Sequence, residues 1–354
     1  MADGGKTRVL IVDDSAIVRK LLAEAVSQAT DLEVVGTAPD PYIARDKILA
    51  LQPDVLTLDI EMPRMDGLTF LKRLMQYRPM PVIVISSLGQ SGCRAALEAL
   101  QSGAIEVLAK PGGPYSVGEL RVDLPVKIRA ASQARLRGNG VKASEQRGPG
   151  AGAARLAPEL PADSLIAIGA STGGTEAVQA ILERLPLDCP PIVVAQHIPA
   201  GFSRAFAERL NRICAMEVRE ASDGDRVTPG RALIAPGNYH LVVERDAAGY
   251  RACVRSGPAV CYQRPSVDVL FRSVAQAAGA KGVGAILTGM GTDGAAGLLE
   301  MRKAGAHTIA QDESTCIVFG MPREAIRLGA ADRVLPLSRI AAGIAHPAPS
   351  SIAR

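Results

Sequence analysis

Short apolar runs alternate with segments of helical periodicity along most of this 354-residue chain. In its first part the apolar runs are 8–12, 32–37, 54–58, 81–86 and 105–109, and the segments with helical spacing are 15–29, 40–51, 66–77, 91–102 and about 116–136. Short apolar strands separated by helices are typical of βαβ units, whose parallel sheet is covered on both faces. The first part therefore predicts a doubly wound, five-stranded parallel α/β domain.

The same alternation returns from about residue 162. The expected strands are 164–169, 191–196, 231–236, 240–245, 251–255, 283–288 and 307–311, and the expected helices are 174–185, 201–212, 266–279, 294–305 and 322–328. Residues 215–257 are rich in strands and look like an antiparallel insert. The pattern predicts a second doubly wound α/β domain that carries this insert.

The segment 137–161 separates the two regions. It contains five glycines, three prolines and almost no large apolar side chain, so it cannot bury enough surface to fold. A chain of this length usually forms domains of about 100–200 residues. We therefore expect a first domain at 6–136, a flexible linker at 137–161 and a second domain at 162–346.

Charge, hydropathy and cysteine spacing exclude several classes of protein. Lys and Arg number 40 against 36 Asp and Glu, and this net charge of +4 is too small to predict nucleic-acid binding. No apolar run approaches the ~20 residues that span a bilayer, and the N-terminus lacks the apolar stretch of a signal peptide. The six cysteines form no C-x-x-C pair, which argues against zinc. We expect a cytoplasmic protein without membrane insertion.

Three carboxylates and a lysine follow strands of the first expected domain. Asp13 and Asp14 come directly after the first strand, Asp59 after the third and Lys110 after the fifth. Because the C-terminal ends of the strands converge in a doubly wound sheet, these groups should lie together. Carboxylates at such short distances repel one another unless a divalent cation neutralises their charge. Because all the ligand atoms are oxygens, this cation is expected to be Mg²⁺ and not zinc. Any one of these aspartates alone is explained as well by helix N-capping.

The motifs that carry this cluster match a known family. They are VDDS (12–15), LDIEMPRMDG (58–67), ISS (85–87) and AKP (109–111). With them, residues 6–136 resemble the receiver domain of two-component response regulators.

That resemblance implies a role for each residue of the cluster. Asp59 matches the aspartate that accepts a phosphoryl group from a histidine kinase, and Asp13 and Asp14 match the acidic pair that holds Mg²⁺ with it. Ser86, at the end of the fourth expected strand, matches the switch hydroxyl. Lys110 matches the lysine that contacts the phosphoryl group.

A glycine-rich turn, GASTGG (169–174), joins an apolar run of the second domain to a helical segment. Glycines at a helix N-terminus can cradle a phosphate, but this spacing fits neither G-x-G-x-x-G nor the P-loop with its lysine. Alternatively, Ser171 is a nucleophile whose oxyanion is stabilised by the following amides and the helix dipole. The turn alone leaves both interpretations open.

A serine nucleophile needs a base, and His197 and Asp293 are candidates for the rest of a triad. Both follow expected strands, so both can reach the edge of the sheet that carries Ser171. Taken alone, a histidine at a strand end is usually a satisfied polar residue, and Asp293 is explained as a helix N-cap. The order Ser, His, Asp differs from the known hydrolase orders, but geometry and not order defines a triad.

Five motifs, in order, make residues 164–340 resemble the catalytic domain of the bacterial chemotaxis protein-glutamate methylesterases. They are IGASTGG (168–174), QHIPAGFSRAFAERLN (196–211), APGNYH (235–240), LTGMGTDGA (287–295) and AQDESTCIVFGMPREAI (310–326).

By position, the resemblance makes Ser171 the nucleophile, His197 the general base and Asp293 the orienting acid. It places Thr172 and Met290 in the lining of the site, with the Met290 backbone N–H as an oxyanion donor. His240 lies in a matched motif and receives no role.

The resemblance implies a phosphorylation-activated hydrolase that removes methyl groups from glutamate methyl esters of chemoreceptors and deamidates receptor glutamines. No cofactor is implied for the hydrolysis, and the partners are methyl-accepting chemoreceptors and a chemotaxis histidine kinase. Two alternatives are a receiver-regulated serine hydrolase of another ester and a DNA-binding response regulator. The latter requires a helix-turn-helix and a basic face, whereas residues 162–354 predict alternating strands and helices.

Overall fold

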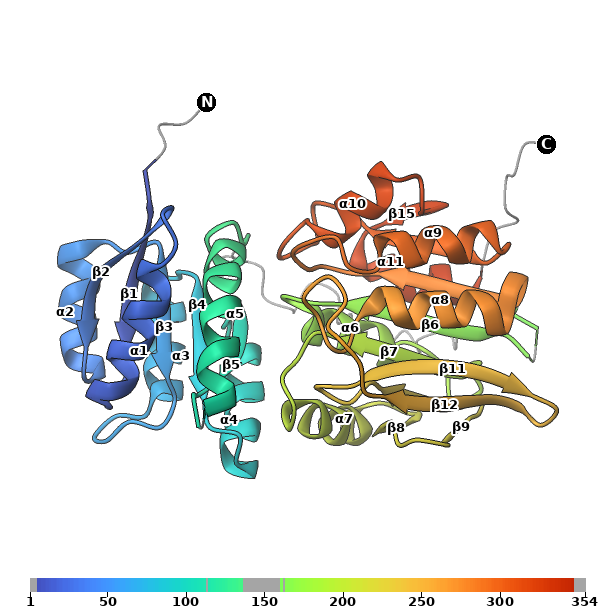
Figure 1. The fold of residues 1–354 in the computed structure, drawn as a ribbon, viewed down its shortest axis with the longest axis horizontal. Helices are drawn as coiled ribbons and strands as arrows, with labels where there is room; N and C mark the ends of the chain where they lie inside the picture. The colour runs from blue at the N-terminus through green and yellow to red at the C-terminus, as the bar shows by residue number, and fades with distance from the viewer. Residues whose placement is uncertain (1–4, 113, 136–159, 162, 347–354) are drawn as a thin grey trace, which may run out of the picture. The chain divides into compact units, whose positions relative to one another are not determined.

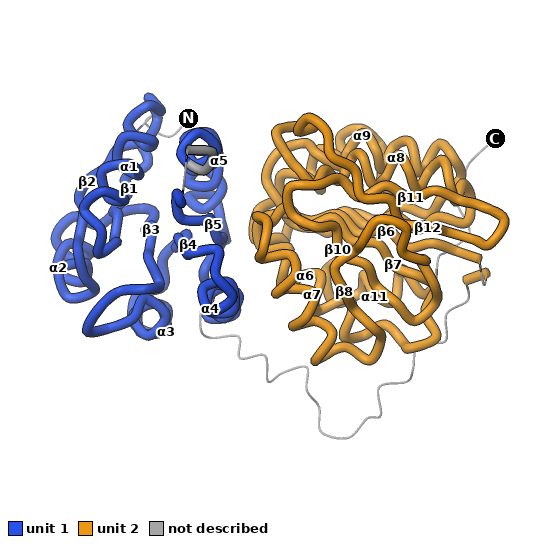
Figure 2. The backbone as a smooth tube through the Cα atoms, turned by 60° about the horizontal axis from the view of Figure 1, so that its bottom comes forward, with its two compact units in different colours: residues 1–149 blue, residues 150–354 orange. Residues whose placement is uncertain are grey.

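The computed structural model describes residues 5–112, 114–135, 160–161 and 163–346. The chain divides into two compact units, residues 1–149 and 150–354 (Figure 2). Of the expected linker at 137–161, all but Leu160 and Pro161 lies outside the described residues. No helix in the described ranges is long and apolar enough to cross a bilayer.

The first unit is built on a five-stranded parallel sheet (Figure 1). Its strands are β1 (Thr7–Val12), β2 (Leu32–Ala38), β3 (Val55–Asp59), β4 (Val82–Ser86) and β5 (Glu106–Ala109). Their order is β2-β1-β3-β4-β5, and all neighbours pair in parallel. The order reverses between β1 and β3, which is where doubly wound sheets bind ligands. The expected architecture of this unit is confirmed.

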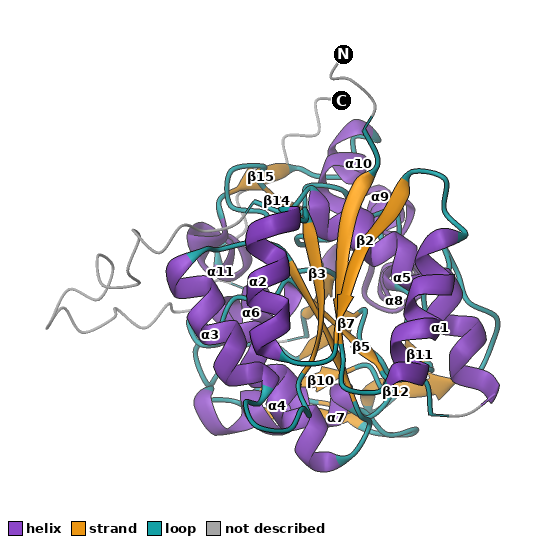
Figure 3. Cartoon of the chain, turned by 90° about the vertical axis from the view of Figure 1, so that its left-hand side faces the viewer, coloured by secondary structure: helices purple, strands orange, loops and turns teal. Residues whose placement is uncertain are grey.

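Helices cover both faces of this sheet. They are α1 (Ala16–Ser27), α2 (Pro41–Leu51), α3 (Gly67–Tyr77), α4 (Gln90–Gln101) and α5 (Pro114–Ser132). Helices α1 and α5 contact each other on one face, and α2, α3 and α4 lie on the other (Figure 3). Ser15, Asp40 and Asp66 start α1, α2 and α3, because each side chain accepts a backbone N–H of the first turn.

The second unit contains a seven-stranded parallel sheet and a separate three-stranded sheet. The parallel strands are β6 (Leu165–Ala170), β7 (Ile192–Gln196), β8 (Glu217–Glu220), β10 (Arg231–Ile234), β13 (Gly282–Ile286), β14 (His307–Gln311) and β15 (Arg333–Leu335). Their order is β15-β14-β13-β6-β7-β10-β8. Since β6 lies between β7 and β13, the strand order reverses at β6, and the C-terminal ends of these three strands meet.

The antiparallel part is smaller than the sequence predicts. Strands β8 and β10 fall inside the expected insert 215–257, yet they pair in parallel with each other, and β10 also pairs with β7. The antiparallel sheet consists of β9 (Arg226–Val227), β11 (His240–Asp246) and β12 (Gly249–Arg255). The prediction is wrong for β8 and β10, because the local sequence of a strand reveals neither its partner nor its direction.

Helices pack on both faces of the larger sheet. They are α6 (Gly174–Leu182), α7 (Phe202–Ile213), α8 (Val267–Ala278), α9 (Ala295–Lys303), α10 (Met321–Arg327) and α11 (Leu337–Ala345), with a 3-10 turn η1 (Gly279–Lys281). Helices α8 and α9 lie side by side (Figure 1), and α8 contacts both β6 and β11. Gly169 in β6 permits this approach, since a Cβ there would lie 2.1 Å from Val267 Cγ1. Strands β8, β9 and β15 and helix α11 have no counterpart among the individual strands and helices that the sequence predicts.

Candidate active site

Strands β6 and β7 bring Ser171 and His197 together. Ala170 pairs with Gln196 in the parallel register, and Ser171 and His197 are the next residues along the two strands. The His197 N–H donates to the Ala170 carbonyl at 3.0 Å. Because neighbouring strands lie about 5 Å apart, the two candidate residues stand side by side at the end of the sheet. Both are buried, with 4% of each residue exposed.

Asp293 joins them from the loop that follows β13. Its Oδ2 lies 2.7 Å from His197 Nε2. A carboxylate can only accept a hydrogen bond, so Nε2 carries the proton and donates it to Asp293. The other ring nitrogen, Nδ1, is buried and has no hydrogen-bond partner among the described residues. In this tautomer Nδ1 holds a free lone pair on the histidine that adjoins Ser171, as a general base requires.

The Asp293 carboxylate also binds the start of α8. Its Oδ1 accepts from Ser266 Oγ at 2.7 Å and from the Asp268 N–H at 3.1 Å, while Oδ2 accepts the Val267 N–H at 2.7 Å. Burial acts to raise the pKa of Asp293, but the hydrogen bond and charge of His197, with the bonds from Ser266 and Asp268, bring it below its ordinary value. Asp293 therefore does cap a helix, but the helix is α8 and not α9, which follows it in the chain.

Close packing holds the turn that carries Ser171. Gln196 Nε2 donates to the Ser171 carbonyl at 2.8 Å and to the His197 carbonyl at 3.1 Å, which ties the two turns together. Gly289 approaches from the loop after β13, and a Cβ there would lie 2.5 Å from Ser171 Cβ. Position 289 therefore has no room for a side chain beside the Ser171 turn.

The two lining candidates lie on these same turns. Thr172 is buried directly after Ser171, and its carbonyl accepts a hydrogen bond from Thr288 Oγ1 at 3.0 Å. Met290 is half-buried and follows Gly289, the residue that packs against Ser171. The fold thus brings both next to the Ser171 turn.

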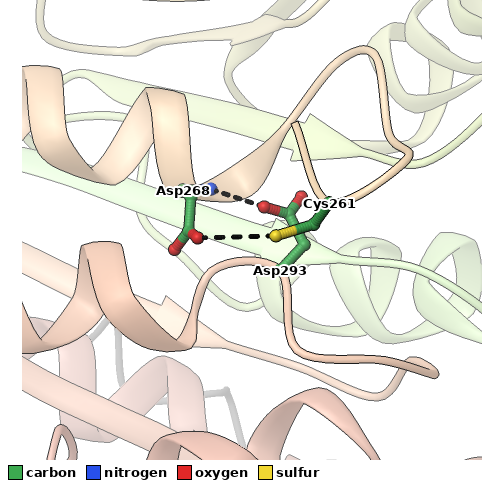
Figure 4. A group of neighbouring side chains, drawn as sticks. All are labelled: Cys261, Asp268 and Asp293. Carbon is green, nitrogen blue, oxygen red and sulfur yellow. Dashed lines mark hydrogen bonds between the residues drawn. The ribbon is translucent and has the colours of Figure 1, made fainter. Parts of the chain in front are cut away.

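Cys261 and Asp268 lie beside Asp293 (Figure 4). Asp268 Oδ1 accepts the Gly297 N–H at 2.6 Å, and its Oδ2 lies 4.0 Å from Cys261 Sγ. Burial, followed by the charges of Asp293 and Asp268, raises the pKa of the Cys261 thiol. Four donors already occupy the Asp293 oxygens and the Gly297 N–H occupies Asp268 Oδ1, so this group offers too few free oxygens for a hard cation, which takes about six.

In the first unit, the expected acidic cluster forms at the ends of β1 and β3. One carboxylate oxygen from each of Asp13, Asp14 and Asp59 lies within 4.8 Å of the others. Lys110 Nζ donates to Asp59 Oδ2 at 2.6 Å and lies 4.0 Å from Asp13 Oδ2. Burial and the charge of Asp59 raise the pKa of Asp13 to about 6, and the buried Asp13 Oδ2 has no hydrogen-bond partner among the described residues. Such a donor set fits a divalent cation.

Ser86, expected on the same rim, is buried at the end of β4. Its hydroxyl donates to the Gly92 carbonyl in α4 at 3.1 Å. The hydroxyl therefore already donates its single hydrogen bond, and it must rotate before it can donate to another acceptor on this rim.

Two family models match the chain. The model described as CheB methylesterase matches residues 166–344, which include Ser171, His197 and Asp293. This chain belongs to the CheB methylesterase family. The model of the response regulator receiver domain matches residues 9–119, so the family's catalytic domain is preceded here by a receiver domain.

Relatives of the CheB family cover nearly the whole chain. The protein-glutamate methylesterase/protein-glutamine glutaminase 2 of Syntrophus aciditrophicus is 56% identical over 338 residues, which are 95% of this chain and 97% of that protein. The protein-glutamate methylesterase/protein-glutamine glutaminase of Salmonella typhimurium is 51% identical over 337 residues, which are 95% of this chain and 95% of that protein. A crystal structure of the Thermotoga maritima CheB methylesterase catalytic domain is similar to 52% of this chain and 98% of its own, with a TM-score of 0.51 and 38% identity.

Two further residues of the CheB domain support the site, although the sequence singled out neither. Ser266 could have been found as a helix N-cap, because its hydroxyl accepts the Val269 N–H at the start of α8. Gln196 has no such local signal, since its partners are a residue beside it and a residue on the neighbouring strand.

Proposed function

We propose that this chain is a receiver-regulated serine hydrolase that releases methanol from glutamate methyl esters of chemoreceptors and ammonia from receptor glutamines. The names of its relatives, protein-glutamate methylesterase/protein-glutamine glutaminase, support this substrate class. The observation that carries the proposal is the 2.7 Å contact between His197 Nε2 and Asp293 Oδ2. It leaves Nδ1 without a partner among the described residues, on the histidine that adjoins Ser171.

In the proposed reaction, His197 Nδ1 takes the hydroxyl proton of Ser171 while Oγ attacks the ester carbonyl. The ring then carries a proton on each nitrogen, and the ionised Asp293 stabilises this positive charge through the Nε2–H bond. His197 returns the proton to the departing methoxide, methanol leaves and an acyl-enzyme remains on Ser171. A water molecule, deprotonated by Nδ1, attacks the acyl carbon, and the released Ser171 oxygen regains the proton.

A receptor glutamine follows the same route with ammonia as the leaving group. Its amide nitrogen leaves only after it receives the proton that His197 holds, so the same base and acid serve both substrates. We propose one catalytic centre for the two activities.

The negative charge on the carbonyl oxygen needs donors in the tetrahedral intermediate. We assign this role to backbone N–H groups at the start of α6 and to the Met290 N–H, with Thr172 lining the same place. The proposal is supported by Gly173, whose φ of +75° makes the turn into α6 tight, and by Gly289, which packs against Ser171.

In the receiver domain, we propose that Asp59 accepts a phosphoryl group from a chemotaxis histidine kinase. Asp13, Asp14 and Asp59 would hold Mg²⁺, which offsets the negative charge that the phosphoryl group brings. Lys110 is suited to bind the phosphoryl group because its Nζ already contacts Asp59. The Ser86 hydroxyl would donate to the same group after it rotates away from the Gly92 carbonyl. The new contacts change the packing of the domain, which provides the regulatory signal.

We further propose a receiver domain at 6–136, a flexible linker at 137–161 and a catalytic domain at 162–346. The matched ranges 9–119 and 166–344 lie inside these limits and support them. A tethered domain has a high effective concentration, so even weak binding of the unphosphorylated receiver can inhibit the esterase, and phosphorylation relieves this inhibition. The protein then acts on chemoreceptors from the cytoplasm, without entering the membrane or binding nucleic acid.

Methanol release from methylated chemoreceptor membranes, measured with and without a small-molecule phosphodonor, tests the function. We expect release that depends on Ser171 and increases with the donor. Hydrolysis of another ester without methanol release would assign the same machinery to a different substrate. A DNA gel shift run in parallel should show no complex, and a specific complex without ester hydrolysis would favour a DNA-binding response regulator.

A further inference from the structure

His240 begins β11, is 5% exposed and takes no part in the mechanism above. Both of its ring nitrogens have hydrogen-bond partners. Nδ1 lies 3.2 Å from the backbone nitrogen of Ser266, and Nε2 lies 2.9 Å from the Pro258 carbonyl oxygen. The ring therefore joins β11 to the start of α8 and to the loop that follows β12.

These partners determine where the ring proton lies. A backbone N–H can only donate, so Nδ1 must present a lone pair to Ser266. A carbonyl can only accept, so Nε2 must carry the proton that points to Pro258. The contacts fit one neutral tautomer of His240, in which one nitrogen accepts and the other donates.

The Ser266 end of this link leads to the catalytic candidates. Ser266 Oγ donates to Asp293 Oδ1, and the N–H groups of the next two residues, Val267 and Asp268, bind the same carboxylate. The peptide N–H that His240 holds thus belongs to the first of three consecutive residues that position Asp293. Asp293 in turn holds the ring of His197.

The Pro258 end has other supports. Arg264 Nη1 donates to the Gly257 carbonyl at 2.6 Å, and Arg264 Nε donates to Asn238 Oδ1 at 2.9 Å. The Asn238 N–H donates to the Arg264 carbonyl at 3.1 Å. These hydrogen bonds of the loop do not involve His240. The Ser266 N–H, by contrast, donates to His240 Nδ1.

We propose that His240 is a positioning residue for the Asp293 carboxylate and that it acts through its Nδ1 bond to Ser266, not through the loop. The proposal rests on the proposed function, because it adds to the same catalytic machinery. Loss of the acceptor leaves a buried N–H unpaired and releases the start of α8, so that Asp293 and His197 lose their alignment. A shift of about 1 Å at a catalytic group can lower a rate about 100-fold.

Two amide substitutions separate the roles of the two nitrogens. His240→Asn places an amide oxygen near the position of Nδ1 and keeps the acceptor for Ser266. His240→Gln reaches the position of Nε2, keeps a donor for Pro258 and loses the acceptor. His307→Gln is the matched control, because His307 is a half-buried histidine that also begins a strand, β14, at the end of the seven-stranded sheet opposite to Ser171 and His197.

The kcat and KM of the full chain are measured by methanol release from methylated receptor membranes. We expect His240→Asn to stay within about threefold of the wild-type kcat and His240→Gln to lose about 10–100-fold, with KM unchanged in both. The downfield proton resonance of the His197–Asp293 hydrogen bond, which needs no substrate, should persist in His240→Asn and weaken in His240→Gln. The control should match the wild type in both measurements.

Equal losses in the two variants, or a larger loss in His240→Asn, would overturn the proposal while leaving the proposed function intact. A wild-type protein that releases no methanol would refute the proposed function. In that case the resonance of the His197–Asp293 hydrogen bond still tests the role of His240, because it is measured without substrate. If His240→Gln does not fold, His240→Leu replaces it, because leucine fills the space of the ring and offers the Ser266 N–H no acceptor. The kcat of His240→Leu should fall about tenfold with unchanged KM, and an unchanged kcat would overturn the proposal.

Discussion

Replacement of Asp293 by asparagine removes the charge at the centre of the hydrogen-bond network. The carboxylate accepts from His197 and Val267 at Oδ2 and from Ser266 and Asp268 at Oδ1. An amide has one oxygen, so its nitrogen must face one of the two backbone N–H groups. We expect it to take the Oδ1 side, where the backbone bond is longer, 3.1 against 2.7 Å, and where the Ser266 hydroxyl can reverse its direction.

The size of the effect follows from the lost charge. Two unit charges about 4 Å apart attract by about 4 kcal/mol at an effective dielectric constant of about 20, which is about three orders of magnitude in rate. We therefore expect Asp293→Asn to lower kcat about 1,000-fold, because the protonated His197 loses its counter-charge. The single buried N–H left facing the amide nitrogen should cost about 1–3 kcal/mol of unfolding free energy.

Methanol release from methylated receptor membranes measures kcat, and urea denaturation measures stability. Asp268→Asn is the matched control, since Asp268 is also buried and lies at the start of the same helix. Its Oδ1 accepts the Gly297 N–H, which an amide oxygen can do equally, so most of the kcat should remain. A loss of less than about tenfold in Asp293→Asn would refute the electrostatic role.

The same substitution has a defined pH dependence. The pKa of Asp293 in the folded protein lies below its ordinary value of 3.8, so ionisation stabilises the folded state relative to the unfolded state. This contribution is fully present above the ordinary pKa and is lost as the pH falls through the lower, folded-state pKa. The stability difference between wild type and Asp293→Asn should be constant near neutrality and shrink below about pH 4. A difference that grows on acidification would contradict the assignment.

Further predictions concern the nucleophile, its packing and the receiver. Ser171→Ala should stay folded and lose several orders of magnitude in turnover, and retention of more than about a tenth would exclude Ser171 as nucleophile. Gly289→Ala forces a Cβ to within 2.5 Å of Ser171 Cβ and should lower kcat at least about tenfold. Gly118→Ala should not, because its Cβ would meet no described residue within 4 Å outside its own helix turn. Asp59→Asn should remain at basal methanol release with any phosphodonor, and a response would place the phosphoryl group elsewhere. A fragment of residues 156–354 should be active without a donor; if it is no faster than the unphosphorylated full chain, the receiver does not inhibit.

Local sequence determined most of the strands and helices, and with them the positions of the chemical groups. Apolar runs separated by helical segments specify parallel strands, and a residue that follows such a strand must lie at the C-terminal edge of the sheet. This reasoning brought Asp13, Asp59 and Lys110 to one edge, and Ser171 and His197 to another. It works because the hydrophobic period and the direction of the chain are local properties.

Partners remote in the chain decided the rest. The sequence could not show that β8 and β10 join the parallel sheet, because strand direction depends on the neighbour. Taken alone, Asp293 is explained as a cap for the helix that follows it, whereas the carboxylate binds the start of α8 and a histidine 96 positions away. The contact of His197 Nε2 with Asp293 and the link from His240 to Ser266 likewise depend on which hydrogen-bond partners the folded chain brings within about 3 Å.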